Sequence, residues 1–317
     1  MIKLAMVAES GTDEQLQTLR QIGIDHLVHY EMANAPGKYQ DLELAISRAA
    51  RFGLRVPVVE SGPPIDRIVQ GTEGWREQTT EWVRLLGVFG TLGVEVVCYN
   101  FMPQVLSDAM VVRTSYTART RGGAITTAYR AADLDPDGLS RGTTPISQEE
   151  MRGNLERFLR DVVPAAEAAG VKLAMHPDDP PVTPMCGLER VMSTVESFDW
   201  LLSLHSSPVH GITLCAGCFA ELGVDVPSLV DRFKDRIHFV HIRNIRGTPR
   251  DFTETFPDDG DIDLARLVRS LNRAGFDGYA RPDHAPLLAT EPRSAPGYGF
   301  QGHLFTIGYL RGLLDAC

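Results

Sequence analysis

The 317-residue sequence has no excess of positive charge. It contains 31 Lys and Arg residues and 41 Asp and Glu residues, so the formal net charge is −10. Binding to nucleic acid needs a basic face, so this deficit argues against a nucleic-acid partner. A small anionic substrate stays compatible with it, because a few local arginines suffice. No apolar run approaches the length of a membrane span, so we expect no membrane partner.

The sequence is also poor in cysteine, with an odd count of five and no regular spacing. Its first residues, "MIKLAMVAESGTDEQ", hold too short an apolar stretch for a signal peptide and soon become acidic. We therefore expect a cytoplasmic protein with reduced thiols. A cysteine in such a protein is buried, catalytic or metal-bound rather than bridged, and we interpret Cys186 and Cys218 as packing or loop residues.

A glycine-rich G-x-G-x-x-G loop after the first apolar segment is missing too, which disfavours an open dinucleotide-binding sheet. What the chain has is eight strand-like segments that alternate with amphipathic stretches. The segments are 2–8, 24–30, 54–60, 94–101, 171–177, 211–217, 237–244 and 277–284. The helical stretches are 75–93, 147–170, 195–205, 226–236, 264–275 and 303–316. This pattern predicts one (β/α)₈ TIM barrel over residues 1–317.

One segment interrupts the alternation. Residues 102–146 are rich in Thr, Arg, Gly and Ala and follow the fourth predicted strand. A connection this long in a compact domain is usually a functional lid or a disordered segment. We predict an inserted loop or lid on the C-terminal face of the barrel, where the active sites of such barrels lie.

Four successive predicted strands each end in a side chain that can bind a metal. They present His176, Cys215, His241 and Asp283. Taken singly, each has an ordinary explanation, for example a buried core thiol at Cys215. Because neighbouring strand ends meet at one rim of a closed barrel, the four together predict a single metal site.

The stretch "VKLAMHPDDP" explains how the first ligand is presented. Pro177 disfavours helical geometry at His176, so the strand stays extended to its end and delivers the imidazole at the rim. Asp178 and Asp179 are expected to form hydrogen bonds behind the ligands rather than to bind the ion. His238 lies three residues before His241 on the same strand, so it should face away and be structural.

The ligand set also bears on the ion. Two imidazoles, a carboxylate and a thiolate suit a borderline transition metal better than Mg²⁺ alone. We expect a divalent metal cofactor, with Mn²⁺ first, Fe²⁺, Co²⁺ and Mg²⁺ as further candidates, and Zn²⁺ as a competitor. Open coordination positions would make the site catalytic rather than structural.

Several motifs in these segments resemble those of the mannonate dehydratase family. They are "VVES" (58–61), "VVCYNFMP" (96–103), "MHPDDPP" (175–181), "LCAGCF" (214–219), "FVHIRNI" (239–245), "RPDHA" (281–285) and "PGYGFQGHLFTIGYLRGL" (296–313). They span nearly the whole chain in order. The resemblance implies a xylose-isomerase-like barrel, often a dimer, that uses a divalent metal to convert D-mannonate to 2-keto-3-deoxy-D-gluconate and water.

Carried over position by position, the resemblance implies the same four metal ligands. It adds His284 and Tyr298 as the acid and base, in roles that the sequence leaves open. Rim positions make four further side chains candidates for binding the substrate. These are Asn100, Arg243, Asn244 and Arg281; Tyr99, next to Asn100, could also touch the substrate, and Glu60 is a weaker candidate of the same kind.

Two stretches depart from the family pattern. Pro257 in "TFPDDGDIDL" stands near the position of an expected histidine, and "QVLSDAMVVRTSY" replaces an aromatic–arginine stretch. The metal site therefore looks intact while its substrate-binding surroundings look altered. Two alternatives stay open: a sugar isomerase or epimerase of the same superfamily, and a non-catalytic protein that binds sugar acids.

Overall fold

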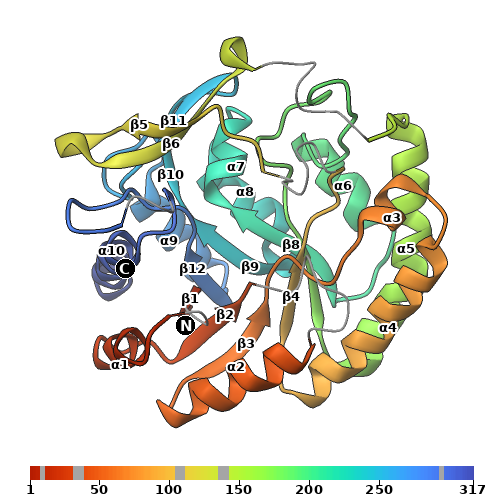
Figure 1. The fold of residues 1–317 in the computed structure, drawn as a ribbon, viewed down its shortest axis with the longest axis horizontal. Coiled ribbons are helices and arrows are strands. Elements are labelled where there is room, and N and C mark those ends of the chain that lie inside the picture. Colours follow the sequence, from red (N-terminus) through yellow and green to blue (C-terminus); the bar gives the residue numbers. More distant parts are fainter. Residues whose placement is uncertain (8–10, 31–38, 104–110, 135–142, 293–295) are drawn as a thin grey trace.

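Eight parallel strands close into a barrel, as predicted (Figure 1). The structure is a computed structural model that describes residues 1–7, 11–30, 39–103, 111–134, 143–292 and 296–317. Around the barrel the order is β1-β12-β9-β8-β7-β4-β3-β2. The strands are β1 (Lys3–Val7), β2 (His26–His29), β3 (Arg55–Val59), β4 (Val96–Tyr99), β7 (Lys172–Met175), β8 (His210–Cys215), β9 (Ile237–Ile242) and β12 (Tyr279–Pro282).

Each of the six predicted helical stretches contains an α-helix. The helices are α1 (Asp13–Gln21), α2 (Tyr39–Arg51), α3 (Asp66–Gln70), α4 (Trp75–Thr91), α5 (Gln148–Ala169), α6 (Val195–Ser203), α7 (Ala216–Glu221), α8 (Val226–Phe233), α9 (Leu264–Arg273) and α10 (Phe300–Ala316). The described residues thus also form α1, α2, α3 and α7, which lie outside the predicted stretches. The 3₁₀ helices are η1 (Arg121–Gly123), η2 (Ala131–Asp133) and η3 (Lys234–Arg236). Among the described helices, none has both the length and the apolar composition that crossing a membrane requires.

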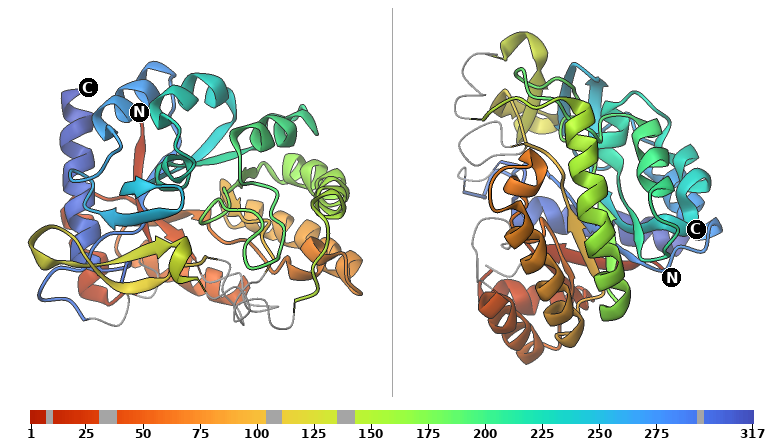
Figure 2. Two further views of the ribbon diagram at one scale, coloured as in Figure 1. Left: turned by 90° about the horizontal axis from the view of Figure 1, so that it is seen from above. Right: turned by 90° about the vertical axis from the view of Figure 1, so that its right-hand side faces the viewer.

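Helix α5 illustrates how the local sequence sets these elements. Ser147 and Glu150 form the predicted capping box at its start, and Gly170 ends it in a left-handed conformation. Leu155, Phe158 and other apolar residues at helical spacing are buried along one face. That face packs beside α4 on the outside of the barrel (Figures 1 and 2).

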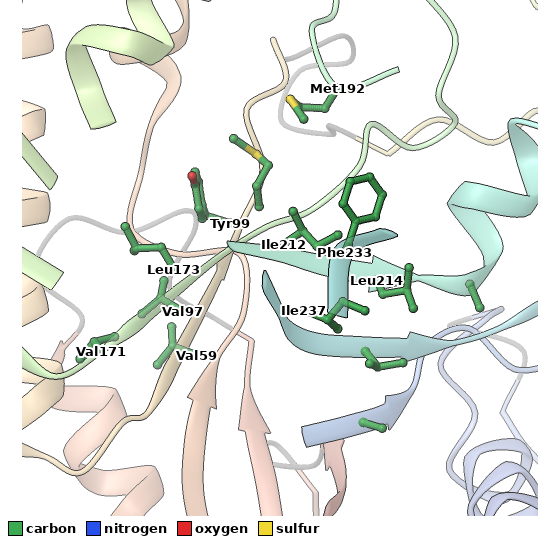
Figure 3. Packing of buried hydrophobic residues seen from close by; sticks show 14 of the residues in the cluster. Val59, Val97, Tyr99, Val171, Leu173, Met192, Ile212, Leu214, Phe233 and Ile237 are labelled. Carbon is green, nitrogen blue, oxygen red and sulfur yellow. The ribbon is translucent and has the colours of Figure 1, made fainter. Parts of the chain in front are cut away.

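Strand side chains alternate between two apolar layers. Val58 belongs to a small cluster inside the barrel, whereas Val59 belongs to the large cluster between the strands and the helices. Figure 3 shows part of this outer layer, including Leu173 and Leu214. The alternation directs every second residue of a strand inward. On β9 it places Phe239 and His241 on the inner side, with their ring centroids 4.8 Å apart.

A second, antiparallel sheet lies beside the barrel, and the sequence did not reveal it. Its order is β10-β11-β6-β5, and Figure 2 shows the β5–β6 hairpin next to β10 and β11. The strands are β5 (Ser115–Arg119), β6 (Ile125–Arg130), β10 (Asn244–Thr248) and β11 (Asp251–Thr255).

Residues 115–119 and 125–130 of the predicted loop form the β5–β6 hairpin rather than irregular structure. Residues 128–130 pair with residues 251–253, more than a hundred positions along the chain, and such a distant pairing has no local sequence signature. The sheet packs on residues 182–188 after β7 through an apolar cluster that includes Tyr129 and Phe252. Residues 104–110 and 135–142 of the predicted lid lie outside the described residues.

Candidate active site

The four predicted metal ligands meet at one rim of the barrel. They come from β7, β8, β9 and β12, which are neighbours in the sheet order. Cys215 ends β8 and is in register with His241 of β9. His176 directly follows β7, and Asp283 directly follows β12. The parallel strands thus carry four side chains, far apart in sequence, to adjacent positions.

Their donor atoms lie close together. Cys215, His241 and Asp283 each offer one atom within 4.8 Å of the other two. Cys215 Sγ lies 3.7 Å from Asp283 Oδ2, and His241 Nδ1 lies 3.8 Å from Asp283 Oδ1. His176 joins them through its Nε2, which is 3.2 Å from His241 Nδ1. It also forms a group of the same kind with Cys215 and Cys218.

The ring contacts of the two histidines fix which nitrogen faces this cluster. His176 Nδ1 lies 2.7 Å from the Pro177 carbonyl, so Nδ1 must donate and Nε2 carries the lone pair. His241 Nε2 lies 3.3 Å from Glu60 Oε2, which directs Nδ1 toward His176. Two nitrogens, a sulfur and a carboxylate oxygen therefore face one another, an arrangement that fits a cation between them.

The electrostatics of the cluster agree with this geometry. Burial raises the pKa of the Cys215 thiol, but the Cys218 hydrogen bond and Arg243 outweigh it and hold that pKa well below its ordinary value. Burial likewise raises the pKa of Asp283, yet His284, Arg281 and Arg243 bring it well below the usual range. Thiolate and carboxylate are the forms that bind metal ions.

The pKa of His241 shifts upward, opposite to the pKa values of Cys215 and Asp283. Burial and Arg281 lower its pKa, but Glu60 and Asp283 raise it well above the ordinary value.

Arg281, predicted to bind substrate, lies on the barrel side of the cluster. Its guanidinium is buried and donates to Glu60, with Nε 2.6 Å from Oε2. Its Nη2 lies 3.0 Å from Asp283 Oδ1. His303 Nε2 lies 2.5 Å from the Asp283 main-chain oxygen. These contacts favour a positioning role for Arg281, because protein carboxylates already engage its guanidinium.

Arg243, the second predicted substrate arginine, is also fully buried. Its Nη2 donates to Glu221 at 2.8 Å, and its Nη1 donates to Asp179 at 3.0 Å. The same Nη1 lies 3.3 Å from both Glu254 Oε1 and Asp283 Oδ2. Arg243 thus links the barrel ligand Asp283 to Glu254 of the antiparallel sheet, and its hydrogen bonds favour positioning over direct contact with the substrate.

The acid and base candidates lie beside the cluster and contact each other. His284 Nε2 is 2.9 Å from the Tyr298 hydroxyl. His284 Nδ1 is 2.8 Å from Glu254 Oε1 and 3.1 Å from Arg243 Nη1. These two contacts need opposite proton positions, and the shorter bond to a carboxylate decides for an Nδ1–H that donates to Glu254. Thr127 Oγ1 donates to the other Glu254 oxygen at 2.5 Å.

The proton therefore sits on Tyr298 in the resting site. Although 40% of the Tyr298 surface is exposed, its hydroxyl lies against His284, and desolvation there raises the pKa of the phenol above the ordinary value, as do Tyr30 and Asp283. In the neutral ring, His284 Nε2 is the acceptor and Tyr298 is the donor. The arrangement offers one proton acceptor and one proton donor side by side, with Glu254 fixing the orientation of the imidazole.

Glu254 and Arg113 are among the site residues that the sequence reasoning missed. Arg113 is buried, with Nη1 2.6 Å from Asp179 Oδ1 and Nη2 2.7 Å from Glu254 Oε1. The alternation of "DFTETF" (251–256) was the available signal, since it predicts a strand with Glu254 on its inner face. Asp179 lies in the network as expected, behind the ligands, and Asp178 accepts from Met192 N and Ser193 Oγ.

Asn244 is better assigned to the loop than to the substrate. Its Nδ2 donates to the carbonyls of Pro257 and Ile262, and its Oδ1 accepts from the amides of Ile245 and Ile262. These bonds use all of its hydrogen-bonding positions and favour a role in holding the loop. Asn100 differs, because its buried Oδ1 has no hydrogen-bond partner among the described residues.

The comparisons with known proteins agree with this site. The sequence profile of the D-mannonate dehydratase (UxuA) family matches residues 9–144 and 139–317. The mannonate dehydratase of Shouchella clausii is 32% identical over 348 residues, covering 97% of this chain and 95% of that protein. That of Lactococcus lactis subsp. cremoris is 33% identical over 304 residues, covering 83% of this chain and 82% of that protein.

Solved structures give the same result. The crystal structure of mannonate dehydratase from Streptococcus suis serotype2 has a TM-score of 0.90 at 29% identity, and covers 100% of this chain and 93% of that chain. A D-tagatose 3-epimerase-like protein has a TM-score of 0.65 at 14% identity, covers 99% of this chain and 98% of that chain, and shares the fold alone. The resemblance seen in the motifs is confirmed, and the chain belongs to the D-mannonate dehydratase (UxuA) family.

Proposed function

We propose that this chain is a metal-dependent hydro-lyase that converts D-mannonate to 2-keto-3-deoxy-D-gluconate and water. The observation that carries the proposal is the hydrogen-bonded Glu254–His284–Tyr298 series beside the four metal-binding side chains, in a member of this family. The intact proton donor and acceptor argue against a binding protein without turnover.

His176, Cys215, His241 and Asp283 would hold the metal ion. When bound, the ion supplies Lewis-acid stabilisation of the negative charge that develops at the substrate carboxylate. The donor set of two nitrogens, one sulfur and one oxygen supports Mn²⁺ or Fe²⁺ more than Mg²⁺.

The charge balance also supports a bound cation. Among the described residues near the cluster, buried carboxylates and a thiolate outnumber buried guanidinium groups. The anionic groups are Glu60, Asp179, Glu254, Asp283 and Cys215, and the cationic ones are Arg113, Arg243 and Arg281. Glu221 is not counted, because burial raises the pKa of its carboxyl well above the ordinary value. A sugar-acid anion would be repelled from such a site unless a divalent cation offset the surplus.

Dehydration removes a proton from the carbon next to the carboxylate and expels the hydroxyl of the following carbon. His284 Nε2 carries a lone pair and is the proposed general base. Tyr298 keeps its proton and is the proposed general acid for the leaving hydroxyl. Their mutual hydrogen bond lets the proton taken by His284 return to Tyr298 after water departs. Asn100, with its unpaired amide oxygen, is the substrate-binding candidate that the structure supports best.

We also propose a cytoplasmic location and a homodimeric or larger assembly. None of the five cysteines forms a disulfide, which supports a reducing compartment. Size-exclusion chromatography with light scattering tests the assembly: a mass of two or more chains is expected, and a single-chain mass contradicts it.

Activity is tested by removing metal with a chelator, reloading with Mn²⁺ or Fe²⁺, and adding D-mannonate. We expect a 2-keto-3-deoxy acid one water lighter than the substrate, and none from the metal-free protein. Absence of this product from D-mannonate and from other hexonates and pentonates, with several metals, would contradict the proposal. Exchange of the substrate proton with solvent without loss of water would instead indicate an epimerase or isomerase.

A further inference from the structure

Cys218 stands one helical turn after the metal-ligand candidate Cys215. The two belong to the sequence Cys-Ala-Gly-Cys (215–218), which begins at the last residue of β8 and enters α7. Both thiols are completely buried. Their sulfurs lie within 4.8 Å of each other, in the group that also contains His176. The sequence reasoning treated Cys218 as a packing residue, and the structure makes it a neighbour of the metal site.

A hydrogen bond from Arg243 fixes one side of the Cys218 sulfur. Arg243 Nη2 donates to Cys218 Sγ at 3.1 Å, so that sulfur is an acceptor on the side of the guanidinium. Arg243 reaches this position because residue 217 is glycine: a Cβ there would meet Arg243 Nε at 2.0 Å. The Cys215 sulfur lies within 4.8 Å of the Cys218 sulfur, so the two thiols are neighbours in the buried site.

A bond between the two sulfurs needs a local movement of the backbone. Residues three apart at the start of a helix have Cβ atoms about 5–6 Å apart, whereas a disulfide needs about 3.5–4.5 Å, so the first turn of α7 must tighten while both side chains rotate. A C-x-x-C pair between a parallel strand and its helix is also the usual setting of thiol–disulfide chemistry.

We propose that Cys215 and Cys218 are an oxidation site: in the metal-free protein, a peroxide converts them to an intramolecular disulfide that takes the sulfur ligand away from the metal. The proposal rests on the proposed role of Cys215 in the metal site. Oxidation and metal loading thereby exclude each other, and a thiol reductant restores the site.

The chemistry balances in two steps. The Cys215 thiolate attacks hydrogen peroxide, the O–O bond breaks, and a sulfenic acid and hydroxide form. The Cys218 sulfur then attacks the Cys215 sulfur, the S–O bond breaks, and the second hydroxide leaves with the Cys218 proton as water. The proton that Cys215 gave up on forming the thiolate joins the first hydroxide, so in total two thiols and one peroxide give one disulfide and two waters.

The experiment uses the full chain, stripped of metal by a chelator and treated with hydrogen peroxide without substrate. Counting free thiols and mapping peptides by mass spectrometry should give the loss of two thiols and one Cys215–Cys218 crosslink, reversed by dithiothreitol. Mn²⁺ at ten times its Kd should slow the crosslink about tenfold, because only about a tenth of the protein stays metal-free. An equal rate with and without Mn²⁺, or no crosslink, overturns the proposal.

Variants make the test specific. Cys218→Ser should form no crosslink while still binding Mn²⁺, and Cys218→Ala repeats the test if the serine variant folds poorly. Cys186→Ser, a buried thiol at another place in the fold, and Cys317→Ser, an exposed one, should crosslink like the wild type. A crosslink that persists in Cys218→Ser overturns the assignment. Because no substrate is present, a failed crosslink leaves the dehydratase proposal standing, and missing dehydration leaves the crosslink result valid.

Discussion

The barrel and the antiparallel sheet contribute different chemistry to one site. The barrel strands β7, β8, β9 and β12 carry the four side chains that can hold a cation. The sheet contributes Glu254 on β11, which orients His284, and Thr127 on β6, which orients Glu254. Arg243 joins both regions through Asp283 and Glu254. Binding of the ion and control of the proton are thus divided between two structures.

Removing a proposed metal ligand from the barrel should have the largest effect on Mn²⁺ affinity and turnover. Asp283→Ala removes a proposed ligand and leaves Arg281 and Arg243 facing one carboxylate fewer. Since even residues behind metal ligands change affinity about 10–100-fold, we expect Mn²⁺ affinity to fall by at least about 100-fold, with no measurable turnover. Isothermal calorimetry and metal analysis measure this. Cys186→Ser is the matched control, and unchanged affinity in Asp283→Ala would contradict the ligand assignment.

Removing the proton donor should stop turnover without removing the ion. Tyr298→Phe keeps the ring, which contacts His284, but deletes the hydroxyl. We expect kcat to fall about 10²–10⁴-fold at unchanged Mn²⁺ content, since general acid catalysis contributes on that order. Tyr116→Phe, at an exposed position of β5, serves as the control. If Tyr298→Phe retains wild-type kcat, another group donates the proton.

Changing Glu254 on the antiparallel sheet should have an intermediate effect on kcat. Glu254→Gln keeps the size of the side chain but weakens its hold on the His284 imidazole. We expect kcat to fall about 10–100-fold with KM and Mn²⁺ content nearly unchanged, and Glu254→Asp to recover part of the loss. Asp258→Asn is the control, because it removes a partly exposed ion pair with Arg121 near the sheet. Loss of Mn²⁺ in Glu254→Gln would contradict the division between the two regions.

The smallest expected effect is on the pH dependence of stability, through His238 on the outer face of β9. His238 faces outward, and burial together with Lys172 lowers its pKa to about 3. In the unfolded chain the pKa is near 6.5, so between pH ~6.5 and ~3 only the unfolded state takes up this proton. Stability is full above pH ~6.5 and falls as the pH drops toward 3.

His238→Asn removes this titration. It should therefore flatten the pH dependence of the unfolding free energy by up to about 1.4 kcal/mol per pH unit in that window. Urea unfolding at several pH values measures the slope. An unchanged slope would contradict the outward, uncharged assignment of His238.

The sequence predicted the barrel side well and the sheet side poorly, for a physical reason. The periodicity of each strand is a local property of the sequence, and parallel strands must end at the same rim of the barrel. His176, Cys215, His241 and Asp283 could therefore be grouped from the sequence alone. Glu254 enters the site only because β11 pairs with β6, a contact that no local pattern encodes. Arg243 and Arg281 were placed at the rim correctly, but their carboxylate partners depend on that same distant packing.

The most direct test of the shared cation is X-ray absorption spectroscopy of the protein loaded with Zn²⁺ as a probe. The site predicts one sulfur at ~2.3 Å together with nitrogen and oxygen atoms at ~2.0–2.2 Å, and loss of the sulfur in Cys215→Ser. A coordination shell without sulfur, or one unchanged in Cys215→Ser, would contradict the central claim that four barrel strands bind one metal ion.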